Sequence, residues 1–253
     1  MNPRADSTSE TPGAAGPAAP SVRPSRVPRF TRAERWVHRA TAVLMGLCVA
    51  TAACLYIPTF AELVGRRALV VTVHEWAGLL LPVPVLAGLA SRAFRADLGR
   101  LNRWGPHDRA WLRAALRRDT RGPARPAAKF NAGQKTYAAW IAGAALVMLG
   151  TGLLMWFTHL TPLMWRTSAT FVHDWLALTV GVVLGGHIGM ALADPEARRG
   201  LRTGSVSREW AEREHPLWRP WAAWGDGNGD GDGRASRGRT QDRPSGSGRG
   251  RGA

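Results

Sequence analysis

The sequence predicts an all-α integral membrane protein, a four-helix transmembrane bundle, from four long apolar windows, uncharged window centres and a one-sided distribution of arginine. The windows are residues 36–57, 68–91, 137–157 and 169–193. Each can form a helix across a bilayer core of about 30 Å, which takes roughly 20 residues. No charged residue occurs in 41–57 or 138–157, whereas the helices of a soluble domain need polar faces.

The net charge of +16 is carried mainly by arginines, whose placement predicts the orientation in the membrane. Arginines crowd before the first window, between the second and third, and after the fourth, while the other two connections hold only Arg66, Arg67 and Arg166. Positive residues mark the cytoplasmic side, so both termini and the central loop are expected inside a bacterial plasma membrane. A nucleic-acid-binding protein would need a binding module around its basic patch, and the sequence contains none, so we expect no nucleic-acid partner.

The chain divides into a membrane domain, residues 29–218, and two tails. Residues 1–28 lack the apolar core of a signal peptide, and residues 219–253 are rich in Gly, Arg and Asp. Neither composition can bury a core, so both tails are expected to be disordered. In the central loop, residues 108–118 alternate apolar side chains with arginines, which predicts an amphipathic helix at the membrane surface.

The two cysteines limit the redox chemistry that the chain can hold. Cys48 and Cys54 lie in the first window, point in different directions and are expected to pack as small apolar residues. No Cys-x-x-Cys-His occurs, which excludes covalently attached c-type haem, and no cysteine set can hold an iron–sulfur cluster. Any such cluster must belong to a partner.

Four of the seven histidines fall in spans at two matched depths. With the amino terminus inside, His38 and His187 lie near the cytoplasmic end, and His74 and His173 lie near the outer end. Ionisable residues inside a membrane are costly and usually functional. His173 and His187 are separated by roughly 21 Å along almost the same helix face, at 1.5 Å per residue. Two stacked sites, each with one imidazole from the fourth window, would need this arrangement.

The paired histidines favour b-type haem, in which two imidazoles fill both axial positions and leave none for a substrate. Small residues would leave room for the flat macrocycle: Gly46, Gly78, Gly150, Gly152, Gly185, Gly186 and Gly189. The alternatives are hydrogen-bonded packing histidines and a proton or metal relay in a transporter. His107, His159 and His215 fall in loops or tails and are expected to be solvated.

Two further segments carry a family resemblance. Residues 129–135 read Lys-Phe-Asn-Ala-Gly-Gln-Lys, and Val-Ser-Arg-Glu-Trp at 206–210 is followed by His-Pro-Leu-Trp at 215–218. With the four histidines, they make residues 29–218 similar to the gamma, or cytochrome b, subunit of formate dehydrogenase, in a wider group with hydrogenase and thiosulfate reductase cytochromes. The resemblance implies two haem b groups, the outer one held by His74 and His173 and the inner one by His38 and His187.

The same resemblance implies a menaquinone site beside the inner haem, near Asn131 and Gln134, whose amides can hydrogen-bond a quinone oxygen. The alternative is that Asn131 only caps a helix. Lys129 and Lys135, the sole lysines, could place a compact charge near a haem propionate or a lipid headgroup.

The implied partners are an iron–sulfur beta subunit and a molybdenum or tungsten catalytic alpha subunit. Electrons would pass from the iron–sulfur subunit through the outer and inner haems to quinone, so the chain would have no formate-oxidising site of its own. Two alternatives remain open: a cytochrome b subunit of a hydrogenase or another molybdoenzyme, and a non-redox transporter or scaffold.

The arginine distribution makes a topology prediction. A reporter that is active only in the periplasm should stay silent when it is fused after Trp224, because the carboxyl terminus is expected to be cytoplasmic. Reporter activity at this position would show that the molecule has the opposite orientation, with the quinone chemistry outside.

Overall fold

The computed structural model describes residues 25–117 and 125–220, which belong to one compact unit, Arg23–Pro220. Apart from 25–28 and 219–220, the expected disordered tails lie outside the described residues. Residues 26–28, assigned to the amino-terminal tail from the sequence, form a short strand.

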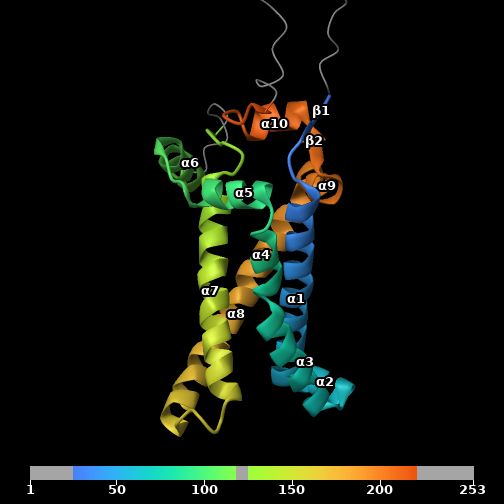
Figure 1. Cartoon of the computed structure of the whole chain (residues 1–253), viewed down its shortest axis with the longest axis vertical. Coiled ribbons are helices and arrows are strands. Elements are labelled where there is room, and N and C mark those ends of the chain that lie inside the picture. Colours follow the sequence, from blue (N-terminus) through green and yellow to red (C-terminus); the bar gives the residue numbers. More distant parts are fainter. Residues whose placement is uncertain (1–24, 118–124, 221–253) are drawn as a thin grey trace, which may run out of the picture. The chain divides into compact units, whose positions relative to one another are not determined.

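Within this unit, four helical spans are long and apolar enough to cross a membrane, which confirms the predicted all-α bundle. They are α1 (Arg32–Tyr56), α3 (Arg67–Leu80) continued by α4 (Val83–Gly88), α7 (Ala132–Trp156) and α8 (Leu163–Ala193). Helix α1 packs along α3, and α7 packs along α8; further contacts join α3 to α7 and α1 to α8 (Figure 1).

The second span differs from the single helix expected over residues 68–91. Pro82 has no backbone N–H to donate to the Gly78 carbonyl, so this carbonyl instead accepts a bond from the Leu81 N–H at 3.2 Å. Pro84 adds a second missing donor within the same turn. The helix therefore ends at Leu80 and restarts as α4, a break that a hydropathy pattern alone does not reveal.

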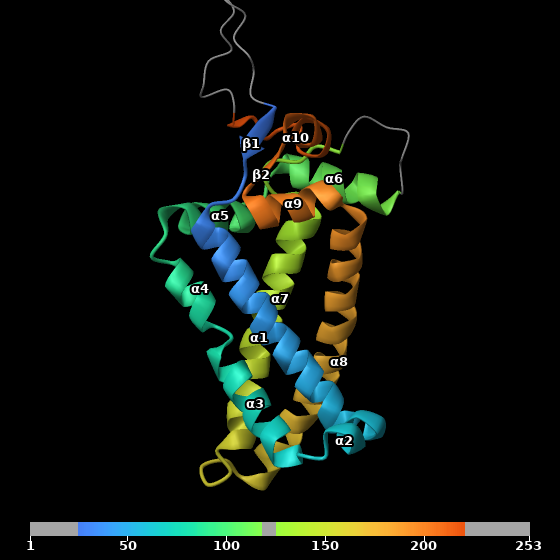
Figure 2. The same ribbon diagram turned by 90° about the vertical axis from the view of Figure 1, so that its right-hand side faces the viewer.

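A layer of short elements covers the end of the bundle where α1 and α7 begin and α8 ends (Figure 2). This surface layer comprises β1 (Arg26–Pro28), α5 (Arg92–Asn102), α6 (Pro106–Leu116), residues 125–131, α9 (Pro195–Thr203), β2 (Ser205–Ser207) and α10 (Arg208–Glu214). Helix α6 is the surface helix predicted at 108–118, and it begins two residues earlier, at a proline. The short α2 (Pro58–Val64) lies at the opposite end.

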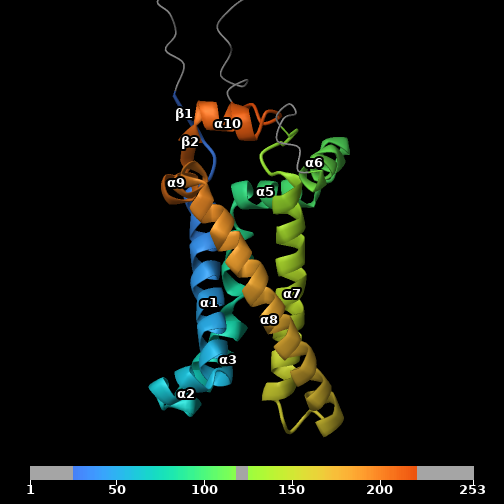
Figure 3. The ribbon, with the colours of Figure 1, turned by 180° about the vertical axis from the view of Figure 1, so that it is seen from behind.

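The two strands tie the start of the membrane domain to its end. They pair antiparallel with Arg26 opposite Ser207 and Val27 opposite Val206, and both valines are fully buried. Gly204, which has φ of 95°, makes the turn before β2, and its carbonyl accepts bonds from the backbone N–H groups of Arg29 and Phe30. The start of α1 is thereby fixed beside the end of α8, as seen from behind in Figure 3.

Candidate functional site

The structure brings His74 of α3 and His173 of α8 together inside the bundle. Their ring centroids are 6.2 Å apart, and the ring planes are inclined at 68°. A metal–imidazole bond of about 2.0 Å on each side would place the centres of two opposed rings roughly 6 Å apart. The spacing of this outer pair therefore fits two axial ligands of one iron.

Each histidine of the outer pair also contacts a threonine hydroxyl on a neighbouring helix. The Oγ1 atom of Thr51, in α1, lies 2.8 Å from Nδ1 of His74. The Oγ1 atom of Thr151, in α7, lies 2.8 Å from Nδ1 of His173. These two threonines were not predicted from the sequence, since a threonine in an apolar helix normally bonds only its own backbone.

The inner pair joins the start of α1 to the end of α8. His38 and His187 thus lie on two helices that contact each other. The His187 ring is stacked on Tyr137 of α7, with centroids 4.4 Å apart and planes inclined at only 7°. Because α8 is one continuous helix, it holds His173 and His187 at two separate levels of the bundle.

The surroundings of the histidines fit a flat group that brings most of its own metal ligands. Gly78 lies one helical turn after His74, on the same face, and a Cβ atom there would meet no atom within 4 Å. Over residues 25–117 and 125–220, no three His, Cys, Asp or Glu side chains gather as a metal site. Two imidazoles suffice for a haem iron, whose other ligands come from the macrocycle.

Asn131 and Gln134 form the capping box that begins α7. The Asn131 side-chain oxygen accepts from the Gln134 N–H at 2.8 Å, and the Gln134 Oε1 atom accepts from the Asn131 N–H at 3.0 Å. The structure thus contains the helix cap that was the alternative interpretation of Asn131. Both amide oxygens are used, whereas the two side-chain NH₂ groups remain able to donate to another acceptor.

Lys135, which follows this capping box, makes a buried ion pair. Its ammonium donates to both carboxylate oxygens of Asp108 and to the Arg103 carbonyl, each at 2.8 Å. The side chains of Lys135 and Asp108 are only 4% and 1% exposed. Burial opposes ionisation of Asp108, but the bonds from Lys135 and the Gly105 N–H hold its pKa below the ordinary value.

Lys129 is bonded in the same way at the other end of the segment. Its ammonium contacts Asp97 of α5 and lies 3.6 Å from Glu34 of α1. Burial, together with a hydrogen bond that Asp97 donates to Glu34, raises the pKa of Asp97 to about 6. Both lysines therefore hold the surface layer on the bundle through ion pairs, and a charge near a haem propionate or a lipid headgroup stays a prediction.

His215 is a second correction, because it is one of the most buried side chains of the described residues and not a solvated one. Its Nδ1–H donates to the Ala128 carbonyl at 2.6 Å, while Nε2 accepts from Arg29 at 3.1 Å. Burial and the neighbouring guanidinium lower the pKa of His215 to about 4. Burial also lowers the pKa of Arg29 to about 10.

Aromatic rings surround this Arg29–His215 contact. The Arg29 guanidinium lies 4.6 Å from the ring centre of Trp210, and the Trp210 ring packs on His215. Trp210 and His215 both belong to the carboxyl-terminal segment, residues 206–218, that carries part of the family resemblance. Of the other two loop histidines, His159 is exposed as expected and His107 is partly buried.

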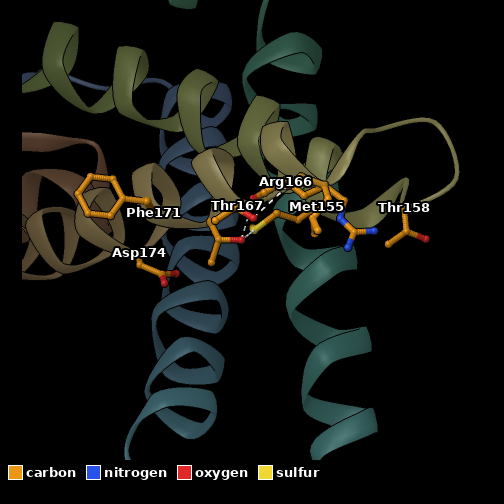
Figure 4. Close-up of a pocket in the computed structure, with 8 residues that line it drawn as sticks. Met155, Thr158, Arg166, Thr167, Phe171 and Asp174 are labelled. Carbon is orange, nitrogen blue, oxygen red and sulfur yellow. Dashed lines mark hydrogen bonds between the residues drawn. The ribbon is translucent and has the colours of Figure 1, made fainter.

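An open depression of about 530 Å³ lies at the opposite end of the bundle from the surface layer (Figure 4). Figure 4 shows that its lining side chains come from the end of α7, the following loop and the first turns of α8; they include Met155, Thr158, Arg166 and Asp174. Asp174 accepts a hydrogen bond from the Tyr56 hydroxyl at 2.6 Å. None of the predicted site residues lines this depression.

Comparison with known proteins gives one family and several relatives. The family model described as prokaryotic cytochrome b561 matches residues 29–203. The cytochrome b556(Fdn) subunit of the nitrate-inducible formate dehydrogenase of Escherichia coli (strain K12) is 30% identical over 93 residues, which are 36% of this chain and 43% of the relative. The Shigella flexneri protein of the same description matches to the same extent.

A longer match extends to the formate dehydrogenase cytochrome b556 subunit of Haemophilus influenzae. It is 24% identical over 203 residues, which cover 77% of this chain and 82% of the relative. The chain thus spans less than half the length of the Escherichia coli relative and most of the Haemophilus influenzae one.

The buried His215 predicts an acid-sensitive surface layer. Its pKa is about 4 when folded and ordinarily 6.5, so the unfolded chain binds more protons between these values. The contribution of the neutral His215 to the free energy of unfolding is fully present above about pH 6.5. It is lost as the pH falls towards 4, by up to about 1.4 kcal/mol per pH unit. Thermal unfolding of the purified chain in detergent should show a shallower acid slope for His215→Gln than for wild type. Replacing the exposed His159 by Gln should leave the slope unchanged, and an unchanged slope in His215→Gln would contradict the assignment.

Proposed function

Since the chain belongs to the prokaryotic cytochrome b561 family, we propose that it is the membrane cytochrome b subunit of a formate dehydrogenase and conducts electrons from an iron–sulfur subunit to menaquinone. Membership of a cytochrome b family implies haem b, and the four candidate spans make the chain a membrane protein. The names of the relatives support the formate dehydrogenase assignment. The partners would be an iron–sulfur beta subunit and a molybdenum or tungsten alpha subunit.

The observation that carries this proposal is the approach of His74 and His173, with ring centroids 6.2 Å apart. We assign them as the axial ligands of the outer haem, and His38 and His187 as those of the inner haem. When bound, haem b with two axial imidazoles supplies reversible one-electron transfer and leaves no coordination position for substrate. The histidines hold the two sites at fixed depths because one of each pair lies on the continuous helix α8.

The quinone would bind near the start of α7, in contact with the side-chain NH₂ groups of Asn131 and Gln134. Gln134 lies one helical turn before Tyr137, and Tyr137 is stacked on His187 of the inner pair. The amide donors and the inner pair are therefore linked through the first two turns of one helix. Buried ion pairs of Lys129 and Lys135 fix both ends of this segment, so the donors are held in place before quinone arrives.

Orientation in the membrane follows from the arginines, which place the surface layer in the cytoplasm. Reduction of quinone takes two electrons and two protons, and the exposed Gln134 lies where protons from the cytoplasm can reach the quinone oxygen. Taking up protons on this side while electrons arrive from the other would separate charge across the membrane.

Each haem should depend on its own pair of histidines. His74→Ala or His173→Ala should remove the outer haem and largely spare the inner one, because only the α8 scaffold is shared. The measurement is the reduced-minus-oxidised spectrum and the haem content of the purified chain, with His159→Ala as the control that keeps both haems. Loss of only the inner haem in the outer-pair variants would show that the pairing is wrong, and a wild-type chain without haem would favour a transporter.

The amide donors should control quinone reduction without affecting the haems. Asn131→Asp and Gln134→Glu keep the oxygens that form the capping box but remove the NH₂ groups. Reoxidation of the pre-reduced haems by a menaquinone analogue should slow on the order of tenfold if roughly 1 to 2 kcal/mol of transition-state stabilisation is lost. Asn102→Asp makes the same change at the end of α5, where the amide donates to the Leu98 carbonyl, and should leave the rate unchanged. Reoxidation at the wild-type rate in both test variants would show that the segment serves only as a helix cap.

A further inference from the structure

Each of the two outer histidines contacts a threonine hydroxyl on a neighbouring helix. Thr51 and Thr151 lie on different helices, yet each places Oγ1 at 2.8 Å from a histidine Nδ1. Each threonine also bonds the carbonyl four residues before it: Leu47 at 2.6 Å and Val147 at 2.8 Å. The same geometry therefore occurs twice, once for each axial position of the outer site.

The carbonyl bonds determine which atom donates the proton between threonine and histidine. A hydroxyl has one proton, and a carbonyl can only accept, so the hydroxyl proton is directed to the backbone of its own helix. The threonine oxygen is then an acceptor, and Nδ1–H of His74 or His173 is the donor. Each hydroxyl also lies within bonding distance of the carbonyl three residues before it, Cys48 at 3.0 Å and Met148 at 3.2 Å.

This assignment fixes the tautomer of the outer pair. A neutral imidazole with its proton on Nδ1 has a free lone pair on Nε2, which is the atom left to bind a metal. A ligand that donates its other N–H to an acceptor is held in one orientation and becomes a more basic, more electron-rich ligand.

Within residues 25–117 and 125–220, the inner pair has no such acceptors. Among the described residues, neither His38 nor His187 makes a side-chain hydrogen bond, and His187 instead stacks on Tyr137. The two sites thus differ in hydrogen bonding while both offer two imidazoles. Electron-rich ligands stabilise the oxidised iron, so the site with hydrogen-bonded histidines should have the lower reduction potential.

We propose that Thr51 and Thr151 are positioning residues that present His74 and His173 through Nε2 and make the outer site the lower-potential of the two. This inference rests on the proposed haem-binding function. It gives a physical cause to the proposed direction of transfer, from the outer site to the inner site and the quinone segment, because electrons move spontaneously from a lower to a higher potential.

The test is a potentiometric titration of the full-length chain carrying both haems, in Thr51→Val, Thr151→Val and the double variant. Valine keeps the shape of threonine but removes the acceptor. The midpoint potential of the outer haem should rise in each single variant and rise further in the double variant. The inner haem should not shift, and Thr51→Ser and Thr151→Ser should restore the wild-type potential.

Matched controls are available in the same bundle. Thr72 of α3 and Thr179 of α8 make the same bond to the carbonyl four residues before, at 3.1 and 2.8 Å, without contacting a histidine. Their valine variants should leave both potentials unchanged. An equal shift in these controls would overturn the inference as a packing effect, as would unshifted potentials in the test variants. Loss of the outer haem in the valine variants, if the serine variants do not keep it, would also overturn the inference. A wild-type chain that binds no haem would instead defeat the proposed function itself.

Discussion

The low polarity of the membrane interior is the constraint on which the rest of this structure depends. Without water, every polar group within a span needs a partner inside the protein. Threonine hydroxyls meet this need by bonding the backbone one turn earlier, as Thr51 does. Histidine cannot do so alone, since its ring has two nitrogens and reaches beyond its own helix. The two outer histidines find partners on other helices: His74 of α3 meets Thr51 of α1, and His173 of α8 meets Thr151 of α7.

Charged groups follow the same rule at the surface layer, where both lysines meet carboxylates. Lys135 meets Asp108, and Lys129 meets Asp97 and Glu34. Breaking one such pair leaves an uncompensated buried charge, which typically costs several kcal/mol, so the pairs enforce one arrangement of the segment between the lysines. That segment begins α7, and its position relative to the inner histidines is accordingly fixed by α5 and α6.

The sequence was sufficient for features that depend on composition and depth, and insufficient for those that depend on contacts. The four spans follow from hydropathy. The relative levels of the histidines follow from helical rise, because helices that cross a membrane run roughly along its normal. His215 was expected in solvent because it lies in a polar segment, yet Arg29, 186 residues earlier, buries it. No local pattern encodes such a contact. The break at Pro82 was visible in the sequence but was outweighed by the apolar residues around it.

The threonine contacts show how the same constraint can also separate the two sites in function. An outer site that only receives and passes electrons gains from rigid ligands, since a fixed geometry reduces the rearrangement that accompanies each change of charge. Hydrogen bonds from Nδ1 of His74 and His173 to the two threonines supply this rigidity. The inner site lies one helical turn from the proposed quinone donors, where each electron must be matched by a proton from water. There His187 is held by a stacked Tyr137 and not by acceptors in its own plane. Stacking restrains the ring without adding negative charge to the ligand, so in the proposed electron path the inner site would keep the higher potential and be the last site before quinone.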